Sequence, residues 1–332
     1  MLEAIVKMNF VNVLFGIAIG DAFGAGIEFQ SREWIREHID FTEYITARKG
    51  KYAENYIVGN YTDDTEMTIG IIKALRSQKV FTPDLLVQFW IQEYESDKER
   101  KGYGRQGHGA MKKVYTGEKT IEEIRSSQQE RQSPGNAPPM RAIPLGYVQE
   151  ELIDTYAIIN ADATHPHPKA RAASIIVARA AQYLLLHDGN PQKIISYCKQ
   201  FIRNIDCETE KLLDVIDTLP APEKLKKEDY KILCGPQPIV NMPGINGLPS
   251  DAMLTGGCAL YILKHARSTM EALRVSIYMG GDVDSLASIC TGIAAGRYGI
   301  ETLPPFMIEK VEGKEYLAMI AHEFEHFLSS QL

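Results

Sequence analysis

Three absences narrow the classes of protein to which this 332-residue chain can belong. Its five cysteines are odd in number and never occur in C-x-x-C spacing, which argues against a disulfide framework and against a structural zinc site. No dense Lys/Arg tract is found and the formal net charge is −7, so the clustered positive charge that nucleic-acid binding requires is missing. We therefore expect no long nucleic acid among its partners.

The beginning of the chain lacks the features of a secretory signal. Residues 1–4 have no basic start, carry an acid at the third position and show no small-residue cleavage site. Residues 10–29 are mostly apolar and include three glycines at four-residue spacing, a pattern of closely packed membrane helices. Asp21 and Glu28 argue against a membrane span, so we expect a buried core helix, with the same device in residues 286–296. The sequence thus predicts a cytoplasmic protein without a membrane segment.

No sustained run alternates between polar and apolar residues as a strand would, and helical signals prevail. Thr82 is a candidate N-cap before Pro83, at the start of a helix expected to reach about Tyr94. Further helices are expected over residues 169–186, 193–205 and 253–265. These signals predict an all-α fold.

Two segments are expected to be irregular. Residues 41–61 contain turn signals and leave room for small β elements, and the Pro- and Gly-rich residues 236–249 are read as a surface excursion, not as an inter-domain linker. The sequence contains no internal repeat and no low-complexity tract. We predict one domain over residues 1–332.

Two short acidic clusters at opposite ends of the chain are its most informative feature. Residues 62–65 read Thr-Asp-Asp-Thr, and residues 280–285 read Gly-Gly-Asp-Val-Asp-Ser. Carboxylates and hydroxyls are the hard oxygen ligands that Mg²⁺ and Mn²⁺ prefer. Adjacent carboxylates repel each other unless a cation, a proton or strong donors compensate. The pattern favours one metal site divided between the two clusters.

A simpler interpretation is that both clusters cap helices. Asp63 and Glu66 have the spacing of a capping box, and Asp282, Asp284 or Ser285 could cap a helix that begins near residue 286. A cap needs one acceptor, whereas these clusters supply four carboxylates. We therefore prefer the metal site.

Three loops offer weaker signals. Gly102 and Gly104 are by themselves typical of turns, although beside a helix N-terminus such a loop can present N–H groups to a diphosphate. Asn136, also just before a helical run, could donate its amide in the same way. His165 stands between turn-forming residues and is as often structural as a ligand for a ribose or phosphate.

Taken in order along the chain, these pieces resemble the ADP-ribosylglycohydrolase family. The similarity extends from about Asn9 to Pro305 and is specific because several short pieces occur in register with both acidic clusters. The matching pieces are residues 16–24 with Glu28 and Phe29, then residues 61–65, 102–104, 135–136, 164–165 and 280–285.

The resemblance implies a helical bundle with a central cleft that holds two Mg²⁺ or Mn²⁺ ions. By position, the metal ligands would be Thr62, Asp63, Asp64, Asp282, Asp284 and Ser285. Glu28 matches an acidic residue that in some members lies close to the metals and the scissile bond, so the catalytic candidates are Glu28, Asp63 and Asp284. The ADP-ribose site would be lined by Gly102, Gly104, Asn136 and His165.

The implied reaction is hydrolysis at C1″ of the distal ribose by a metal-associated water, which releases ADP-ribose from a protein or a small molecule. ADP-ribosyl-arginine is the first expectation for the substrate, with ADP-ribosyl-serine or a small ADP-ribosylated molecule as alternatives. Residues 137–139 read Ala-Pro-Pro where a glycine-containing sequence is expected, which leaves the acceptor open. A catalytically silent binding or structural protein and a phosphohydrolase that yields AMP are the competing functions. The oligomeric state and the catalytic base also stay open.

Overall fold

The computed structural model describes residues 9–48, 56–101 and 111–331. Within these ranges the chain forms 17 α-helices and no strand, which confirms the all-α prediction. Two isolated β-bridges occur, both at Gly281. The β elements allowed for in residues 41–61 are not found in the described part of that segment.

The α-helices have the following bounds: α1 Phe10–Ala25, α2 Arg32–His38, α3 Asp63–Arg76, α4 Pro83–Lys101, α5 Met111–Tyr115, α6 Ile121–Gln129, α7 Ala137–Met140, α8 Ile153–Asp162, α9 Pro168–Ala181, α10 Ile194–Lys199, α11 Cys207–Asp217, α12 Lys227–Cys234, α13 Ala252–His265, α14 Thr269–Ile277, α15 Val283–Tyr298, α16 Pro305–Lys310 and α17 Lys314–Ser329. Short 3₁₀ turns cover Ile143–Tyr147, Glu150–Leu152, Pro191–Lys193 and Pro222–Lys224, and a π turn covers Gln182–Leu186.

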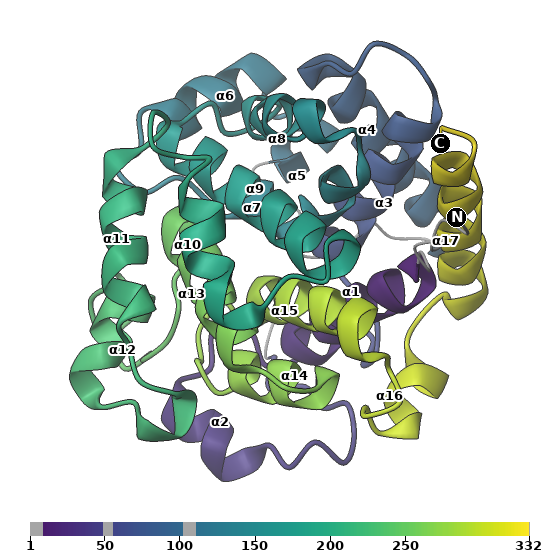
Figure 1. Cartoon of the computed structure of the whole chain (residues 1–332). Helices are drawn as coiled ribbons and strands as arrows, with labels where there is room; N and C mark the ends of the chain where they lie inside the picture. Colours follow the sequence, from purple (N-terminus) through teal and green to yellow (C-terminus); the bar gives the residue numbers. More distant parts are fainter. Residues whose placement is uncertain (1–8, 49–55, 102–110, 332) are drawn as a thin grey trace, which may run out of the picture.

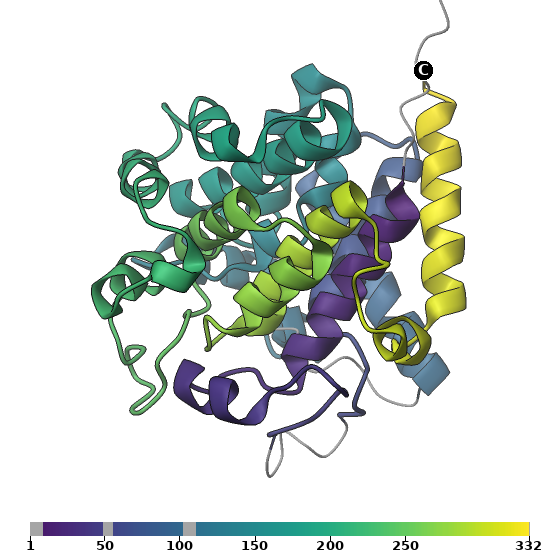
Figure 2. The same cartoon turned by 60° about the horizontal axis from the view of Figure 1, so that its bottom comes forward.

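Helices α1 and α15 lie side by side at the centre of the molecule (Figures 1 and 2). Glycines make this contact possible, because a Cβ atom on Gly20 would lie 2.3 Å from the carbonyl oxygen of Ala287, and one on Gly24 would lie 2.4 Å from the Cα atom of Asp284. The predicted pair of closely packed core helices is therefore confirmed. None of the described helices combines the length and the apolar character needed to cross a bilayer.

The remaining helices surround this pair. Helix α17 covers one side of α1, and the backbone N–H of Phe10 donates a hydrogen bond of 2.7 Å to Glu325 of that helix. Helices α9 and α13 pack against each other and against α15 on the other side. The N-termini of α3 and α15 thereby lie against each other, where the Ser288 hydroxyl of α15 donates to Oδ1 of Asp64 in α3 at 3.2 Å, and the acidic clusters meet there.

Most predicted helices occur, with different ends. The backbone N–H of Leu85 donates to the Thr82 hydroxyl at 3.2 Å, as expected of an N-cap, but α4 runs beyond Tyr94. The helix expected over residues 193–205 ends at Lys199. Turns follow Lys199, and a π turn over Gln182–Leu186 ends the run that was predicted from residue 169. Hydrophobic periodicity does not reveal such endings.

Candidate active site

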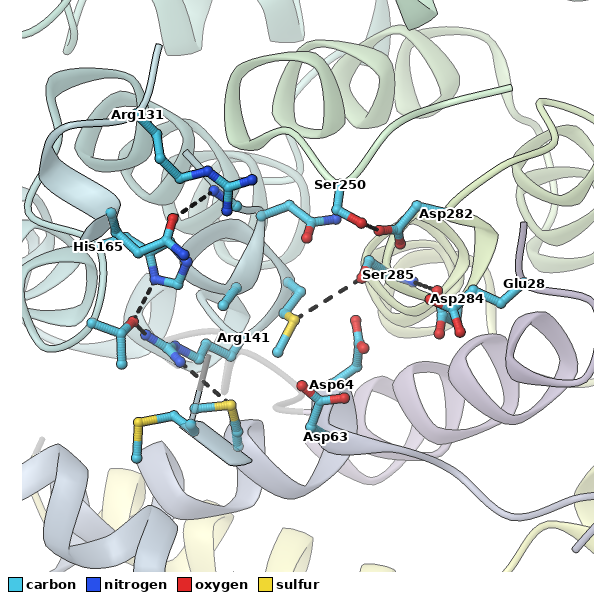
Figure 3. A pocket seen from close by; sticks show the side chains of 18 residues that line it. Glu28, Asp63, Asp64, Arg131, Arg141, His165, Ser250, Asp282, Asp284 and Ser285 are labelled. Atoms are coloured by element: carbon cyan, nitrogen blue, oxygen red, sulfur yellow. Dashed lines mark hydrogen bonds between the residues drawn. The ribbon is translucent and has the colours of Figure 1, made fainter. Parts of the chain in front are cut away.

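A single cavity collects residues from both ends of the chain (Figure 3). Its acidic wall is formed by Glu28, Asp63, Asp64, Asp282, Asp284 and Ser285. Its opposite wall includes Gln128, Arg131, Gly135, Asn136, Arg141, Thr164 and His165. The fold thus brings together Asn136, His165 and the predicted members of both clusters except Thr62, which does not line the cavity. Gly102 and Gly104 lie outside the described residues.

The first cluster is held in place by a carboxylate that the sequence analysis left unassigned. Asp21 of α1 is fully buried and accepts hydrogen bonds from the backbone N–H groups of Thr62 and Thr65, at 2.9 and 3.0 Å. The hydroxyls of the same two threonines donate to it at 2.8 and 2.6 Å. Thr62 is the N-cap of α3 and Asp63 its first residue, so the capping box considered from the sequence is not the cap. Asp21 caps α3 from the neighbouring helix.

The Thr62 hydroxyl is oriented by this arrangement. Because it donates its proton to Asp21, its lone pairs are left for another partner. Asp63 and Asp64 follow in the first turn of α3, where the helix dipole favours negative charge. The signal for Asp21 in the sequence was a single acid within an apolar run.

The second cluster is fixed by a junction of three segments at Gly281. This residue donates to the carbonyl of Gln30 at 2.9 Å and accepts from the N–H of Phe29 at 2.8 Å. On its other side, Leu248 donates to Gly280 and accepts from Asp282, both at 2.8 Å. A Cβ atom on Gly281 would lie 2.1 Å from the carbonyl oxygen of Leu248, and φ is +76° there, so only glycine fits. The junction places Glu28 beside Asp282.

The segment read as a surface excursion therefore ends inside the site. Its last residues pair with the Gly280–Asp282 backbone, and Ser250, which follows directly, lines the cavity. The Ser250 hydroxyl donates to Oδ2 of Asp282. Ser250 was missed from the sequence because no pattern around it distinguishes it from other loop serines.

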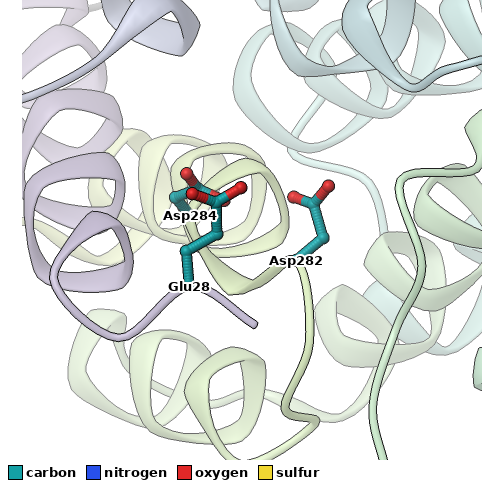
Figure 4. Close-up of side chains that lie close together, drawn as sticks. All are labelled: Glu28, Asp282 and Asp284. Carbon is teal, nitrogen blue, oxygen red and sulfur yellow. The ribbon is translucent and has the colours of Figure 1, made fainter. Parts of the chain in front are cut away.

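Three carboxylates converge closely enough to share one cation (Figure 4). Glu28, Asp282 and Asp284 each offer an oxygen, and these oxygens lie within 4.8 Å of one another. Oδ1 of Asp282 is buried and has no hydrogen-bond partner among the described residues. An orphaned carboxylate oxygen within a set of hard oxygen donors fits a divalent cation of the Mg²⁺ or Mn²⁺ type.

The electrostatics of the acidic wall also favour a bound cation. Burial raises the pKa of the Asp63 carboxyl well above its usual range, and the charge of Asp64 raises it further. Burial likewise raises the pKa of Asp64 and of Asp284, with added repulsion from nearby carboxylates. A bound cation would remove both penalties, since it favours the charged forms.

Glu28 differs from its neighbours in having a basic partner. Arg48 donates to its Oε2 at 2.9 Å and to the carbonyl oxygen of Ala25 at 2.6 Å, so it links the carboxylate to the end of α1. Burial and the charge of Asp282 raise the pKa of Glu28 to about 7, against the lowering effect of Arg48.

The opposite wall is a closed hydrogen-bond network. Arg141 is fully buried, stacks over the Trp90 ring at 3.8 Å, and donates to Oδ1 of Asn160 and to the Thr164 hydroxyl, both at 2.8 Å. Nδ1 of His165 lies 2.7 Å from the Thr164 hydroxyl. Burial lowers the pKa of Arg141 to about 9.

His165 and Asn136 reach the cavity from this wall. Burial, together with the charge of Arg141, holds the pKa of His165 well below its usual value, so its imidazole is neutral. Asn136 is nearly buried and donates through Nδ2 to the Thr255 hydroxyl at 3.2 Å. Both side chains are thus pre-positioned by protein contacts.

The family model described as ADP-ribosylglycohydrolase matches residues 3–331. The chain belongs to the ADP-ribosylglycohydrolase family. This membership confirms the resemblance seen in the sequence and the prediction of an ADP-ribosyl hydrolase at the level of the family.

Relatives within the ADP-ribosylglycohydrolase family are distant but cover nearly the whole chain. ADP-ribosylhydrolase ARH3 of Gallus gallus is 23% identical, with 98% of this chain and 94% of the relative covered. The ADP-ribosyl-dinitrogen reductase glycohydrolase of Rhodospirillum rubrum is 22% identical, with 92% and 90% covered. A solved structure described as an ADP-ribosylglycohydrolase-related protein complex has a TM-score of 0.68 at 18% identity, covering 96% of this chain and 98% of that one, which supports the fold.

Proposed function

We propose that this protein is a metal-dependent hydrolase that releases ADP-ribose from an ADP-ribosylated protein or small molecule. The observation that carries the proposal is the meeting of Glu28, Asp282 and Asp284 within 4.8 Å, in a cavity that also contains Asp63 and Asp64. The relatives from Gallus gallus and Rhodospirillum rubrum are described as an ADP-ribosylhydrolase and an ADP-ribosyl glycohydrolase, which supports hydrolysis of an ADP-ribosyl bond.

The acidic wall is the proposed binding site for two Mg²⁺ or Mn²⁺ ions. The residues that would hold them are Asp63, Asp64, Asp282, Asp284 and Ser285, which line the cavity, and Thr62, the N-cap of α3, which does not. When bound, the cations supply Lewis-acid polarisation of substrate oxygens and a lowered pKa for water. The side chains contribute a fixed array of oxygens, because Asp21 anchors one cluster and the Gly281 junction anchors the other.

Glu28, Asp63 and Asp284 are the proposed catalytic residues. Their carboxylates line the cavity where C1″ of the distal ribose would lie, and each can accept a hydrogen bond from the attacking water. Arg48 restrains Glu28 by a hydrogen bond of 2.9 Å to Oε2.

The opposite wall is the proposed site for the rest of ADP-ribose. Asn136 and the neutral His165 can donate or accept hydrogen bonds without bringing a charge. Gly102 and Gly104, outside the described residues, stay in this proposal through the family resemblance alone. ADP-ribosyl-arginine is the first proposed substrate, with ADP-ribosyl-serine or a small molecule as alternatives.

Two further proposals concern the whole chain. We propose that residues 1–332 form one domain. We also propose a cytoplasmic location, because free cysteines suit a reducing compartment.

Mass spectrometry of reaction products tests the proposal. Arg-linked and Ser-linked ADP-ribosylated peptides would be incubated with the protein, with Mg²⁺ or Mn²⁺ and with chelator. We expect metal-dependent release of intact ADP-ribose from one of the two linkages. Release of AMP would establish a phosphohydrolase instead, and no turnover of any substrate in the presence of metal would contradict the proposed activity.

A further inference from the structure

Residues 246–252, here called the strap, connect the two walls of the cavity. At the acidic wall, Leu248 makes two backbone hydrogen bonds of 2.8 Å, one with Gly280 and one with Asp282. Toward the opposite wall, the N–H of Ala252 donates to the carbonyl of Pro134 at 3.0 Å, next to Gly135 and Asn136. The backbone on both sides of Ser250 is therefore fixed.

The end of the strap is also the start of a helix. Asp251 is the N-cap of α13, and its Oδ1 accepts from the N–H of Leu254 at 2.9 Å. Leu248 is hydrogen-bonded to the Gly280–Asp282 backbone on one side of Ser250, and Asp251 caps α13 on the other, so Ser250 has little freedom to move. Its hydroxyl is held at the cavity wall by the backbone of its neighbours.

Asp282 needs an external partner to hold its orientation. It is the N-cap of α15, yet its side chain makes no capping hydrogen bond. Asp284, by comparison, accepts from the backbone N–H of Ser285 at 2.9 Å within its own helix. The Ser250 hydroxyl is the donor that occupies Oδ2 of Asp282, and Oδ1 is left buried with no hydrogen-bond partner among the described residues.

We propose that Ser250 is a positioning residue, which occupies one oxygen of Asp282 so that the other is turned toward the divalent cation. This inference rests on the proposed metal-dependent function and deepens it. A hydroxyl donor to a ligating carboxylate fixes the rotation of the carboxylate and removes alternatives in which both oxygens turn away from the site. Ser250 acts through Asp282 and need not touch the substrate.

The test compares Ser250→Ala with Ser250→Thr, which keeps the hydroxyl. Mn²⁺ affinity is measured on the full chain by the electron paramagnetic resonance signal of free Mn²⁺. We expect Ser250→Ala to weaken Mn²⁺ binding by about 10-fold, the lower end of the range for loss of a partner to a metal ligand, and Ser250→Thr to restore most of it. Ser196→Ala removes an exposed serine hydroxyl that donates to a backbone carbonyl far from the cavity and serves as control.

A double-mutant cycle with Asp282→Ala separates positioning from a general structural role. If Ser250 acts through Asp282, adding Ser250→Ala to Asp282→Ala causes no further loss of Mn²⁺ affinity. Additive losses would overturn the proposal, as would wild-type Mn²⁺ binding by Ser250→Ala. With either outcome, metal-dependent turnover by the wild type would still support the proposed hydrolase function. Absence of Mn²⁺ binding and of turnover in the wild type would overturn both.

Discussion

The two walls of the cavity solve the problem of buried polar groups in opposite ways. On the acidic wall, five carboxylates converge, and among the described residues Arg48 is the one basic side chain that pairs with them, through Glu28. On the opposite wall, the buried Arg141 guanidinium forms no ion pair with a carboxylate of the described residues, and it contacts an amide, a hydroxyl and an aromatic ring. The carboxylates of the acidic wall repel one another, whereas the polar groups around Arg141 on the opposite wall hydrogen-bond to one another.

This contrast separates residues that await a ligand from residues that keep the walls in place. Buried carboxylates with raised pKa values lower stability until a cation or protons neutralise them. A buried network such as the one around Arg141 stabilises one conformation of the opposite wall and holds the neighbouring Asn136 and His165 in place. Substitutions on the acidic wall should therefore affect activity more than stability, and substitution of Arg141 should do the reverse.

The largest effect is expected from Asp63→Ala or Asp284→Ala. Each removes a proposed oxygen ligand and should reduce turnover on the order of 10³-fold, or about 4 kcal/mol of transition-state stabilisation. The metal-free variants should be as stable as the wild type or more stable, because carboxylate repulsion is relieved. Turnover assays and urea denaturation in chelator measure both. Unchanged turnover in both variants would refute the divided site.

Arg141→Ala should break the opposite wall. It leaves Asn160 and Thr164 without their donor inside the core and opens a cavity beside Trp90, so we expect a loss of about 3 kcal/mol in the free energy of unfolding. Urea denaturation monitored by circular dichroism gives this value. A loss below that of an exposed control such as Arg203→Ala would show that the network contributes little.

Arg48→Gln tests the single basic partner of the acidic wall. Glu28 loses the donor that links it to the end of α1, and we expect kcat/KM to fall about 10-fold, or roughly 1.4 kcal/mol. Arg48→Lys should recover little of the loss, because an ammonium does not reproduce the fork that holds both Glu28 and the Ala25 carbonyl. Full activity in Arg48→Gln would show that Glu28 needs no restraint.

The last effect is a pH dependence of the metal-free protein. The pKa values of Asp63, Asp64 and Asp284 are raised on folding, and that of Glu28 rises to about 7, so the folded state binds more protons than the unfolded chain. Stability is then highest below the unfolded pKa values and falls as pH rises through the folded values, and the shift of Glu28 alone corresponds to about 3 kcal/mol. Thermal unfolding in chelator at several pH values measures this. A rise in stability over the same range would contradict it, and added Mn²⁺ should abolish the decline.

Local patterns were enough to predict much of this site. Within residues 62–65 and within residues 280–285 the acidic residues lie at most two positions apart, so each cluster could be recognised without knowledge of the fold. Asn136 and His165 were predicted from the family resemblance. The supports escaped prediction because their partners are remote. Asp21 lies 41 residues from Thr62, and Ser250 lies 32 residues from Asp282. A single acid or serine carries no local signal of such a contact.

The sequence by itself determined the all-α class, the helices with their glycine faces, and the chemical character of both clusters, because helix propensity, periodicity and ligand type are local properties. Only the tertiary structure decided that the clusters face one cavity. Backbone approach at Gly20 and Gly24 and the three-way junction at Gly281 depend on segments distant in the chain, and their hydrogen bonds exist only once the helices have packed.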